Sequence, residues 1–447
     1  MASTTTSKFP LPPQVEKTLD TLHDAGHEAW IVGGAVRDFL AGRAPQDWDV
    51  TTDALPERVI DLFGGATVIE TGRKHGTVTV VQDGLPVEVT TYRVDGAYSD
   101  CRRPDKVRFT RSLEEDLARR DFTVNAVAYD PRRGLRDPFG GADDLAAGIV
   151  RCVGEPERRF GEDALRILRA LRFAAQFDME IEPRTAAALR AGRDKLAAVA
   201  AERVQVELTK LLCGAAAARV LRTYAEVIAV PLPEIVPAFG LDQRNPYHDR
   251  DVWEHTLAVV DAVPPTAVLR WAALLHDLGK PVCFTVDEAG VGHFYGHGER
   301  SVELARDVLK RLRFAAADAE RIIELVRRHD MPIPPEREPL LRLLRRVGEE
   351  GTRDLIDLHR ADAMGQAAAY RDRLILYDRT EKLLDDLLAE RACFSLKDLA
   401  VDGRDALSLG LSGPAVGRAL EGCLDAVIRG EVLNERGALL ERLKAHE

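Results

Sequence analysis

Strand-forming patterns are confined to the first part of this 447-residue chain, and this division constrains the fold more than any other feature. Residues 29–32, 77–81 and 86–92 are β-branched or alternate in polarity, and an Asp-Gly pair at 83–84 separates the last two. Such a pair between two strands is a strong hairpin signal. Beyond about residue 155 the chain is rich in Ala, Leu, Arg and Glu with helical periodicity. We therefore expect an α+β protein with a small mixed α/β head, followed by an elongated all-helical part.

Length and composition indicate several domains outside any membrane. A chain of 447 residues is too long for one ordinary core, so two to four domains are expected. No run approaches the roughly 18 apolar residues that a membrane span requires, and we recognise no secretory signal or transit peptide. The six cysteines are scattered without a Cys-x-x-Cys motif, which fits a reducing compartment. We expect a cytoplasmic protein, and no pattern in the sequence indicates an oligomeric state.

The net charge of −11 is unusual for a protein that acts on nucleic acid. Binding to nucleic acid depends on local clusters of charge more than on the total. Basic residues cluster at 102–120 and again at 151–172, whereas the acidic excess lies elsewhere, largely in the C-terminal third. The overall charge therefore does not exclude a nucleic-acid substrate.

Two aspartates, Asp47 and Asp49, flank Trp48 on a segment that we expect to be extended. Side chains alternate along a strand, so the two carboxylates point to the same side, about 6.6 Å apart. They repel each other unless cations lie between them, and Mg²⁺ binds through one or two carboxylates plus substrate phosphates. Two metal ions commonly clamp the attacking and leaving oxygens in phosphoryl displacement. The pair predicts such a Mg²⁺ site, although an isolated Asp-x-Asp is more often a solvated loop.

Three further segments supply groups that suit a nucleoside triphosphate. Gly33 and Gly34 allow the backbone to approach phosphates, and Arg37 offers a fork of donors to them. Glu88 interrupts an apolar strand and is a candidate third carboxylate, the alternative being an edge-strand residue that faces solvent. The third segment contains Arg119, Arg120, Asp121 and Asn125. The two arginines are candidates for binding the triphosphate, and Asp121 or Asn125 is a candidate for binding a ribose hydroxyl.

Five motifs, taken in order, resemble those of class II CCA-adding enzymes, the tRNA nucleotidyltransferases related to bacterial poly(A) polymerases. They are Gly-Gly-Ala-Val-Arg-Asp at 33–38, Asp-Trp-Asp at 47–49, Glu-Val-Thr-Thr-Tyr-Arg at 88–93, Arg-Arg-Asp-Phe-Thr-Val-Asn-Ala at 119–126 and Gly-Glu-Asp-Ala-Leu-Arg at 161–166. The resemblance covers about residues 25–215. It implies a polymerase-beta-like nucleotidyltransferase head, with Asp47 and Asp49 as ligands of Mg²⁺ and Glu88 as the third acid.

The last of these motifs predicts how a base could be selected. If residues 163–172 form one helix, its polar face carries Asp163, Arg166, Arg169 and Arg172. Residues three apart on a helix are neighbours, so Asp163 would offer an acceptor beside the donors of Arg166. Cytosine and adenine both present an amine donor next to a ring-nitrogen acceptor, whereas uracil and guanine present a carbonyl in place of the amine. The pair would thus accept CTP and ATP and reject UTP and GTP, unless it is an ordinary surface ion pair.

A second metal site is indicated by His276-Asp277, preceded by His255 and followed by Asp362. This order resembles that of HD phosphohydrolases, and imidazole with carboxylate suits divalent Mn, Fe, Ni or Zn. His297 and His329 are candidates for completing a larger or binuclear site. Such a domain is either a phosphohydrolase or an inert helical scaffold. Related enzymes imply cyclic-phosphate RNA ends as the substrate class.

We divide the chain into four parts: a nucleotidyltransferase head at 1–150, a neck with the base-recognition helix at 151–215, a body with the HD motif at 216–375 and a tRNA-binding tail at 376–447. The predicted function is template-independent addition and repair of the 3′-terminal CCA of tRNA, using CTP, ATP and Mg²⁺ and releasing pyrophosphate. The segment 92–104 resembles the flexible loop of enzymes that add the final A, which favours full CCA addition over CC addition.

Several alternatives remain open from the sequence. They are a specialised A-adding or CC-adding enzyme, a poly(A) polymerase, an HD phosphohydrolase with the head as a sensor, and a helical RNA-binding protein with an inactive head. The HD motif and the lack of a strongly basic C-terminal arm weigh against poly(A) polymerase. The intact Asp-x-Asp weighs against an inactive head, which would have no need to retain two repelling carboxylates.

Overall fold

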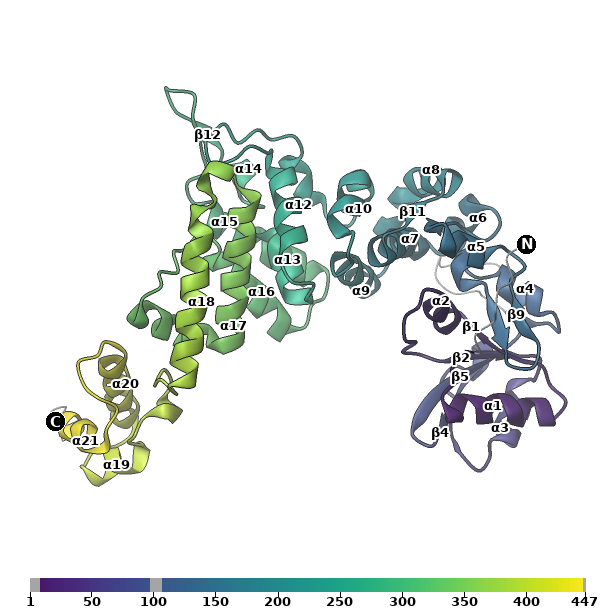
Figure 1. Ribbon diagram of the computed structural model, residues 1–447, viewed down its shortest axis with the longest axis horizontal. Helices are drawn as coiled ribbons and strands as arrows, with labels where there is room; N and C mark the ends of the chain where they lie inside the picture. The colour runs from purple at the N-terminus through teal and green to yellow at the C-terminus, as the bar shows by residue number, and fades with distance from the viewer. Residues whose placement is uncertain (1–8, 97–106, 445–447) are drawn as a thin grey trace. The chain divides into compact units, whose positions relative to one another are not determined.

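The computed structural model describes residues 9–96 and 107–444, which divide into two compact units, Met1–Pro233 and Glu234–Glu447 (Figure 1). Most of the predicted flexible loop at 92–104 lies outside the described residues. Within the described part, no helix is long and apolar enough to cross a membrane. The predicted division into four parts remains a prediction, since the structure itself separates only these two units.

The first unit is built on a seven-stranded mixed sheet. In spatial order its strands are β3 (Thr67–Ile69), β4 (Thr77–Gln82), β5 (Leu85–Thr91), β2 (Asp49–Thr52), β1 (Ala29–Val32), β8 (Ala128–Asp130) and β9 (Gly134–Arg136). Strands β2 and β5 run parallel, and the other neighbours run antiparallel. The predicted hairpin joins β4 and β5, and both turn residues, Asp83 and Gly84, have positive φ, as a tight hairpin turn requires.

The two faces of this sheet have different roles. Helices α1 (Pro13–Asp24) and α3 (Pro56–Leu62) lie together on one face (Figure 1). Val50, Val87 and Val89 are buried in the apolar core on this face. Because side chains alternate along a strand, Asp49 and Glu88 point to the opposite face. The acids therefore lie on the face away from this core, and the same face carries a second apolar cluster that includes Trp30 and Val32.

The remainder of the first unit is mainly helical. Its other helices are α2 (Gly34–Leu40), α4 (Leu113–Ala118), α5 (Gly141–Ala146), α6 (Pro156–Glu162), α7 (Leu165–Phe177), α8 (Pro183–Gly192), α9 (Ala201–Leu212), α10 (Ala217–Thr223) and α11 (Ala225–Ile228). Two small strand pairs accompany them, β6 (Arg93–Asp95) with β7 (Val107–Phe109) and β10 (Ile149–Val150) with β11 (Glu180–Ile181). Helix α7 buries Leu165, Leu168 and Leu171, as their spacing predicts, and packs against α9.

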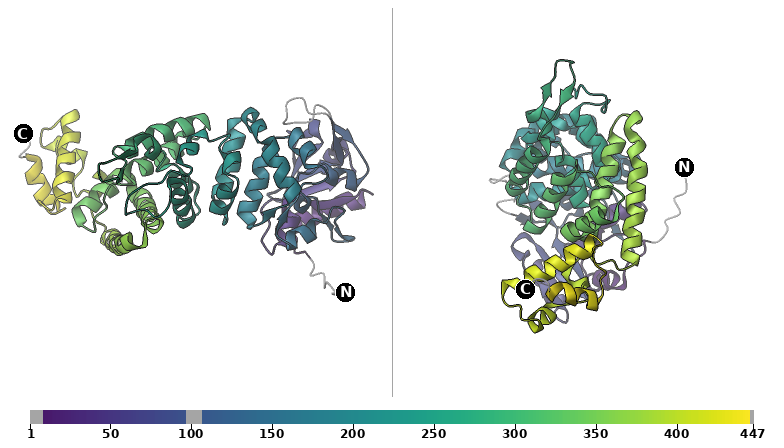
Figure 2. Two further views of the ribbon diagram at one scale, coloured as in Figure 1. Left: turned by 90° about the horizontal axis from the view of Figure 1, so that it is seen from above. Right: turned by 90° about the vertical axis from the view of Figure 1, so that its left-hand side faces the viewer.

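The second unit is helical apart from one short hairpin, β12 (Thr285–Val286) and β13 (Gly292–His293), which projects beyond its helices (Figures 1 and 2). The helices are α12 (Val252–Ala262), α13 (Ala267–Leu275), α14 (Lys280–Cys283), α15 (His297–Arg311), α16 (Ala316–Arg328), α17 (Arg337–Gly365), α18 (Leu374–Ala389), α19 (Gly403–Ser408), α20 (Pro414–Ile428) and α21 (Arg436–Lys444). Helix α17 is kinked at Gly348, whose φ of 73° is not helical. The expectation of an α+β head with a helical remainder is confirmed.

Candidate functional site

The candidate catalytic centre of the first unit begins with two carboxylates on neighbouring strands. Asp49 is the first residue of β2, and it lies opposite Glu88 of the parallel strand β5. Neighbouring strands are about 4.8 Å apart, so side chains at paired positions share one face. Strand β5 lies between β4 and β2, so Glu88 is not on an edge strand. The register therefore favours Glu88 as a third acid over the alternative of an edge residue.

Asp47 precedes the strand instead of lying on it. Strand β2 begins only at Asp49, so the expected extended segment through Asp47 and Trp48 is not part of the strand. Asp47 is exposed while Trp48 is buried, and the Trp48 ring meets that of Phe9 edge-on at 5.9 Å. Anchoring of Trp48 in the core leaves Asp47 directed away from it. The alternation expected of an extended pair is thus kept, although a bend replaces the strand.

Asp49 lies within the electrostatic influence of Glu88 and Asp47. Burial raises its pKa from 3.8 to about 6, and the negative charges of Glu88 and Asp47 add to this effect. Arg120 acts in the opposite sense and lowers the pKa. Burial and neighbouring negative charges disfavour the ionised form of such an acid, and a bound cation would favour it. These three carboxylates would hold Mg²⁺.

This pKa leads to a pH-dependence prediction. A Mg²⁺ ion binds the carboxylate, so protonation of Asp49 below about pH 6 competes with it. We expect the Mg²⁺ concentration needed for half-maximal nucleotide transfer to rise about ten-fold for each pH unit below that value. Metal titrations at pH 5, 6 and 7 would measure this shift. A Mg²⁺ requirement that does not change over this range contradicts the role of Asp49 as a ligand.

Gly33 brings the glycine turn against these acids. Its φ is 70°, in the region that favours glycine, and a Cβ there would lie 3.0 Å from Arg120 Nη1 and 3.4 Å from Asp49 Oδ2. Gly34 follows as the first residue of α2. A side chain at position 33 would therefore be strained and crowded, and the turn lies against both Arg120 and Asp49.

Asp116 contacts both predicted phosphate-binding arginines, Arg119 and Arg120. It is fully buried, accepts a 2.9 Å hydrogen bond from Arg119 Nε, and lies 3.8 Å from Arg120 Nη2. Thr51, which is two residues beyond Asp49 on β2, donates to its other oxygen at 3.1 Å. Sequence reasoning missed Asp116. Its signal, an acid one helical turn before two arginines, is common on exposed helices.

A hydrogen-bonded chain joins the 33–38 and 119–126 motifs and continues to Arg169 of α7. Arg37 Nη1 donates to Asn125 Oδ1 at 2.8 Å, and Asn125 Nδ2 donates to Asp121 Oδ1 at 2.9 Å. Arg169 Nε donates to the other oxygen of Asp121 at 2.7 Å. Burial alone would raise the pKa of Asp121, but Arg169 and the Asn125 hydrogen bond outweigh it and keep the pKa far below its usual range. Asp121 therefore acts as an ionised acceptor that orders the donors around it.

The helical argument for Asp163 and Arg166 is wrong in its local geometry. Helix α6 ends at Glu162, and Asp163 has extended backbone angles of −142° and 107° before α7 begins. Asp163 accepts from Arg203 Nη2 at 2.7 Å and from Nη1 at 3.4 Å, while Arg166 Nη1 donates to Glu162 Oε2 at 2.7 Å. Arg203 belongs to α9, forty positions further along the chain. The two predicted base-reading groups are thus each held by another residue.

The other two arginines of this segment differ in their surroundings. Arg169 is partly exposed and pairs with Asp121, at 2.6 Å. Arg172 is buried, lies over the ring of Phe173 and contacts Glu207 of α9 at 3.1 Å. Burial lowers the pKa of Arg172, and Glu207 opposes the effect. Arg172 is therefore placed to connect α7 and α9, and its predicted contact with a nucleotide remains a prediction.

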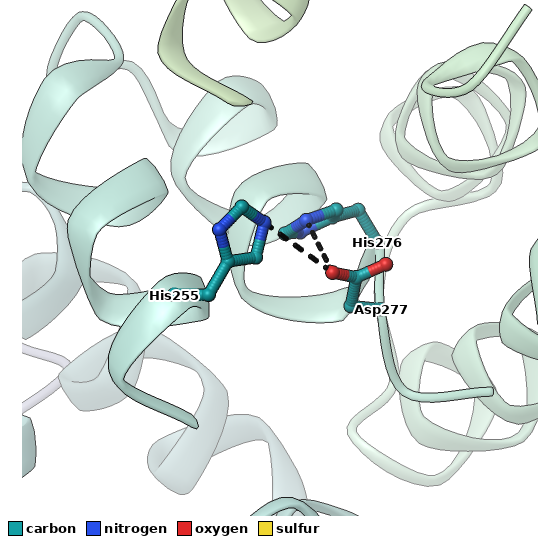
Figure 3. Close-up of side chains that lie close together, drawn as sticks. All are labelled: His255, His276 and Asp277. Carbon is teal, nitrogen blue, oxygen red and sulfur yellow. Dashed lines mark ion pairs between the residues drawn. The ribbon is translucent and has the colours of Figure 1, made fainter. Parts of the chain in front are cut away.

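The second unit brings together all four residues of the predicted HD site. Figure 3 shows three of them, His255, His276 and Asp277. The Nε2 atoms of His255 and His276 lie 3.4 Å and 3.1 Å from the same oxygen of Asp277. Asp362 of α17 completes the group, with Oδ1 3.0 Å from His255 Nε2 and 3.8 Å from His276 Nε2. These residues come from α12, the end of α13 and α17, so the helical packing of this unit assembles the group.

A second group shares Asp277. The Nε2 atoms of His297 and His329 each lie 3.6 Å from Asp277 Oδ1, the oxygen that faces away from the first pair. The two imidazole nitrogens are 3.2 Å apart. The possible ligand atoms of each triad lie within 4.8 Å of one another. One carboxylate therefore lies between two pairs of imidazoles, which is the arrangement of a bridging ligand.

Backbone carbonyls orient three of these histidines. A carbonyl only accepts, so an Nδ1 that contacts one must carry the proton, and Nε2 is left as the free acceptor. The Nδ1 atoms donate at 2.7–2.9 Å to carbonyls three residues earlier, in the pairs His276–Ala273, His297–Phe294 and His329–Val326. His276 and His329 come directly after the last residues of α13 and α16. The carbonyls in the last turn of a helix lack partners within the helix, so they are free to accept from these imidazoles.

The charges of this site also fit a divalent ion. Burial would raise the pKa of Asp277, but His276 and Lys280 outweigh it and hold the pKa well below its usual range. The buried Asp277 Oδ2 faces His276 Nε2 at 3.1 Å and Lys280 Nζ at 2.7 Å. Buried charged groups are paired or coordinate metals. A donor set of imidazoles and carboxylates suits a transition metal of the Mn, Fe, Ni or Zn class.

Comparison with known protein families places three matches along the chain. Residues 29–151 match the poly A polymerase head domain, and residues 178–233 match the probable RNA and SrmB-binding site of polymerase A. Residues 250–387 match the HD domain. The first match contains the carboxylates, the glycine turn and Asp121, and the last contains both histidine groups.

Individual relatives give the same picture at two levels of similarity. The CCA-adding enzyme of Bacillus pumilus is 32% identical over 439 residues, which are 96% of this chain and 95% of that protein. The CCA-adding enzyme of Geobacillus thermodenitrificans is 44% identical over 262 residues, so this chain spans only 61% of its length. The crystal structure of the Bacillus stearothermophilus CCA-adding enzyme in complex with CTP has a TM-score of 0.70 and 32% identity, covering 97% of this chain and 98% of that one.

Proposed function

Because this chain belongs to the family of CCA-adding enzymes, as the match along nearly its whole length shows, we propose that it builds and repairs the 3′-terminal CCA of tRNA. CTP and ATP would be its nucleotide substrates, and pyrophosphate the product. The observation that carries this proposal is the register of Asp49 with Glu88, with Asp47 alongside, on the sheet face that also holds Gly33 and Arg120. A relative solved with CTP supports the choice of nucleotide.

The proposed reaction is attack of the tRNA 3′ hydroxyl on the α-phosphate of the nucleotide. Asp47, Asp49 and Glu88 would hold Mg²⁺, which would supply charge stabilisation at the attacking and leaving oxygens. Arg119 and Arg120, which both contact Asp116, would bind the departing phosphates. Catalysis of this kind is mostly positioning and electrostatic stabilisation, which a preorganised set of donors provides.

Base selection is assigned to Asp163 and Arg166. An ionised carboxylate has about four acceptor sites, and Arg203 with the Leu165 amide occupies three of those on Asp163. One acceptor on Oδ2 is then left for an exocyclic amine, while the guanidinium of Arg166 can donate to the adjacent ring nitrogen. In a base with a carbonyl in place of the amine, the carbonyl oxygen would lie against Asp163 Oδ2, and neither oxygen could donate a hydrogen bond. The arrangement therefore supports selection of C and A over U and G.

Transfer is tested with a tRNA that ends at the nucleotide before CCA. We expect CMP incorporation and pyrophosphate release that require both this tRNA and Mg²⁺. A long A tail on any RNA would instead favour poly(A) polymerase. A product that stops after CC, or growth only from a tRNA that already ends in CC, would favour the CC-adding or A-adding alternative.

A second candidate function is phosphoester hydrolysis in the second unit. The observation that favours it is Asp277, whose two oxygens each face a pair of imidazole nitrogens. Asp277 would bridge two divalent transition-metal ions, with His255, His276 and Asp362 on one side and His297 and His329 on the other. Such ions supply an activated water and polarise a phosphoryl oxygen. Cyclic-phosphate RNA ends are the proposed substrate class.

Metal content provides a direct prediction for this site. We expect about two divalent ions per chain after loading with Mn²⁺ or Ni²⁺, about one in His329→Ala, and none in Asp277→Asn, measured by elemental analysis of the dialysed protein. Nucleotide transfer by the first unit should be unchanged in both variants. The exposed Asp261→Asn of α12 is the control and should keep both ions. Full metal content in Asp277→Asn contradicts the bridging role.

A further inference from the structure

A cavity of about 930 Å³ in the second unit combines a charged centre with exposed apolar walls. Its volume lies within the usual range for small-molecule sites. Buried polar groups that line it include Asp277, Lys280 and His329. Four large apolar side chains that also line it remain exposed, and they are Tyr247, Tyr295, Met331 and Leu376. The cavity therefore offers more than a phosphate or metal site, since a simple phosphate gains nothing from apolar walls.

The rings of Tyr295 and His293 stack on each other in the wall of this cavity. We call this pair the aromatic platform. The rings are nearly parallel, with an angle of 9° and centroids 5.2 Å apart. Tyr295 is 80% exposed, so most of its surface, including a ring face, is left uncovered. Both residues line the cavity, and His297 follows Tyr295 by two positions. The platform thus adjoins the second histidine group along the chain and in space.

The hairpin that carries the platform is held in shape by Asp287. His293 Nε2 lies 2.9 Å from Asp287 Oδ2, and Asp287 Oδ1 accepts from the backbone amides of Ala289 and Val291 at 2.9 Å. These contacts fix the ring plane of His293, on which Tyr295 rests. A ring whose plane is already fixed loses less conformational freedom when it stacks on a ligand.

Two cations of the same cavity suit a phosphate group. Lys280 Nζ lies 2.7 Å from Asp277 Oδ2 and over the ring of Phe294. Arg373 is exposed and forms no hydrogen bond or ion pair with any described residue. An arginine without a partner beside an acid-rich metal site is a ready donor for phosphate oxygens. Phosphate-binding groups and a stacking surface therefore occur together in one cavity.

We propose that the aromatic platform binds the base of a nucleotide whose phosphate lies at the Asp277 site. This assignment rests on the proposed hydrolase function and names what its ligand must carry, namely a nucleobase as well as a phosphoester. Stacking tolerates any base, because every base has a π face. A purine covers more of Tyr295 than a pyrimidine does. The site therefore prefers adenosine and guanosine phosphates to cytidine phosphates, and all of these to phosphates without a base.

Calorimetric titration of the full-length protein with adenosine 3′-monophosphate, cytidine 3′-monophosphate and glycerol 2-phosphate tests this proposal. All proteins carry Arg166→Ala, so that the head contributes no base-reading site, and all are loaded with Mn²⁺. We expect Tyr295→Ala to raise the Kd for the adenosine ligand about ten-fold, and the Kd for glycerol 2-phosphate not to change. Tyr295→Phe should retain the affinity, since it keeps the ring. Val286→Ala on the same hairpin, which lies outside the cavity lining, should behave as the parent.

The results separate the platform from the hydrolase function. Equal affinities for the three ligands, or an adenosine affinity that Tyr295→Ala does not change, would overturn the platform. Phosphate release from glycerol 2-phosphate without base preference would support the hydrolase and overturn the platform. Base-dependent, Tyr295-dependent binding without hydrolysis of any ligand would support the platform and overturn the hydrolase.

Discussion

Asp49→Asn is expected to abolish nucleotide transfer and, at the same time, to stabilise the metal-free protein. Activity should fall on the order of 10³-fold or more, because removing a ligand of the Mg²⁺ site removes several kcal/mol of transition-state stabilisation. Stability should rise because the half-buried Asp49 carboxylate has a pKa raised to about 6 beside Glu88 and Asp47. Asparagine has nearly the same shape without the charge.

The pH dependence of this stability effect has a definite sign. Between pH 3.8 and about 6 the folded state holds the Asp49 proton more tightly than the unfolded chain does. The free energy of unfolding therefore falls as the pH rises through this window, and the whole penalty is present above it. Replacement by asparagine should recover about 1–3 kcal/mol at pH 7.5 and much less at pH 4.

Chemical denaturation in EDTA at the two pH values measures the effect, together with single-turnover transfer in Mg²⁺. Asp61→Asn, an exposed acid on α3, serves as the matched control and should change neither quantity. An Asp49→Asn protein that is less stable at pH 7.5, or that retains transfer, would contradict the assignment of Asp49 to a metal site.

The second large effect concerns the choice of base. In Asp163→Ala the acceptor for the exocyclic amine is lost, so the ratio of kcat/KM for CTP to that for UTP should fall at least about a hundredfold. Transfer itself should continue, because Asp47, Asp49 and Glu88 are untouched. Single-nucleotide incorporation with each of the four triphosphates measures this ratio. An unchanged ratio would refute base reading by Asp163.

Arg203 should share in this selectivity because it fixes the Asp163 carboxylate. Arg203→Ala is expected to lower the same CTP-to-UTP ratio, and Arg203→Lys to restore it only partly, since lysine lacks the two-pronged donor geometry. Arg184→Ala removes another arginine–carboxylate pair of this unit, with Glu155 at 2.9 Å, on the exposed surface. This control should leave the ratio unchanged.

The three candidate catalytic acids could be selected from the sequence, but the pairing of Glu88 with Asp49 could not. Glu88 could be selected because a charged residue within an apolar strand is rarely buried unless it is paired or bound to a metal. Its pairing with Asp49 depends on β5 lying beside β2, although β3 and β4 come between them along the chain. Strand order is set by long-range packing, which local patterns do not record.

The geometry of Asp163 shows where helical reasoning fails. Every residue from 162 to 166 is compatible with a helix, so the sequence contains no signal for the break after Glu162. The reason for the break lies elsewhere, since the extended Asp163 meets Arg203 of α9 and caps the Leu165 amide. An ion pair that spans forty positions cannot be inferred from local spacing.

The residues of the HD group, unlike the geometry of Asp163, could be identified from residue type and order alone. His255, His276, Asp277 and Asp362 do converge, as predicted. What only the structure provides is the position of Asp277 between two pairs of histidines and the role of helix-terminal carbonyls in orienting them.

The proposed function requires that one chain completes CCA and then stops. The most direct measurement supplies a tRNA that lacks CCA with all four triphosphates and Mg²⁺ together, and determines the sequence of each product 3′ end. The proposed function predicts that nearly all extended molecules end in CCA, without U or G and without further growth. Products with a long A tail, with U or G in place of C or A, or with an end at CC would contradict it.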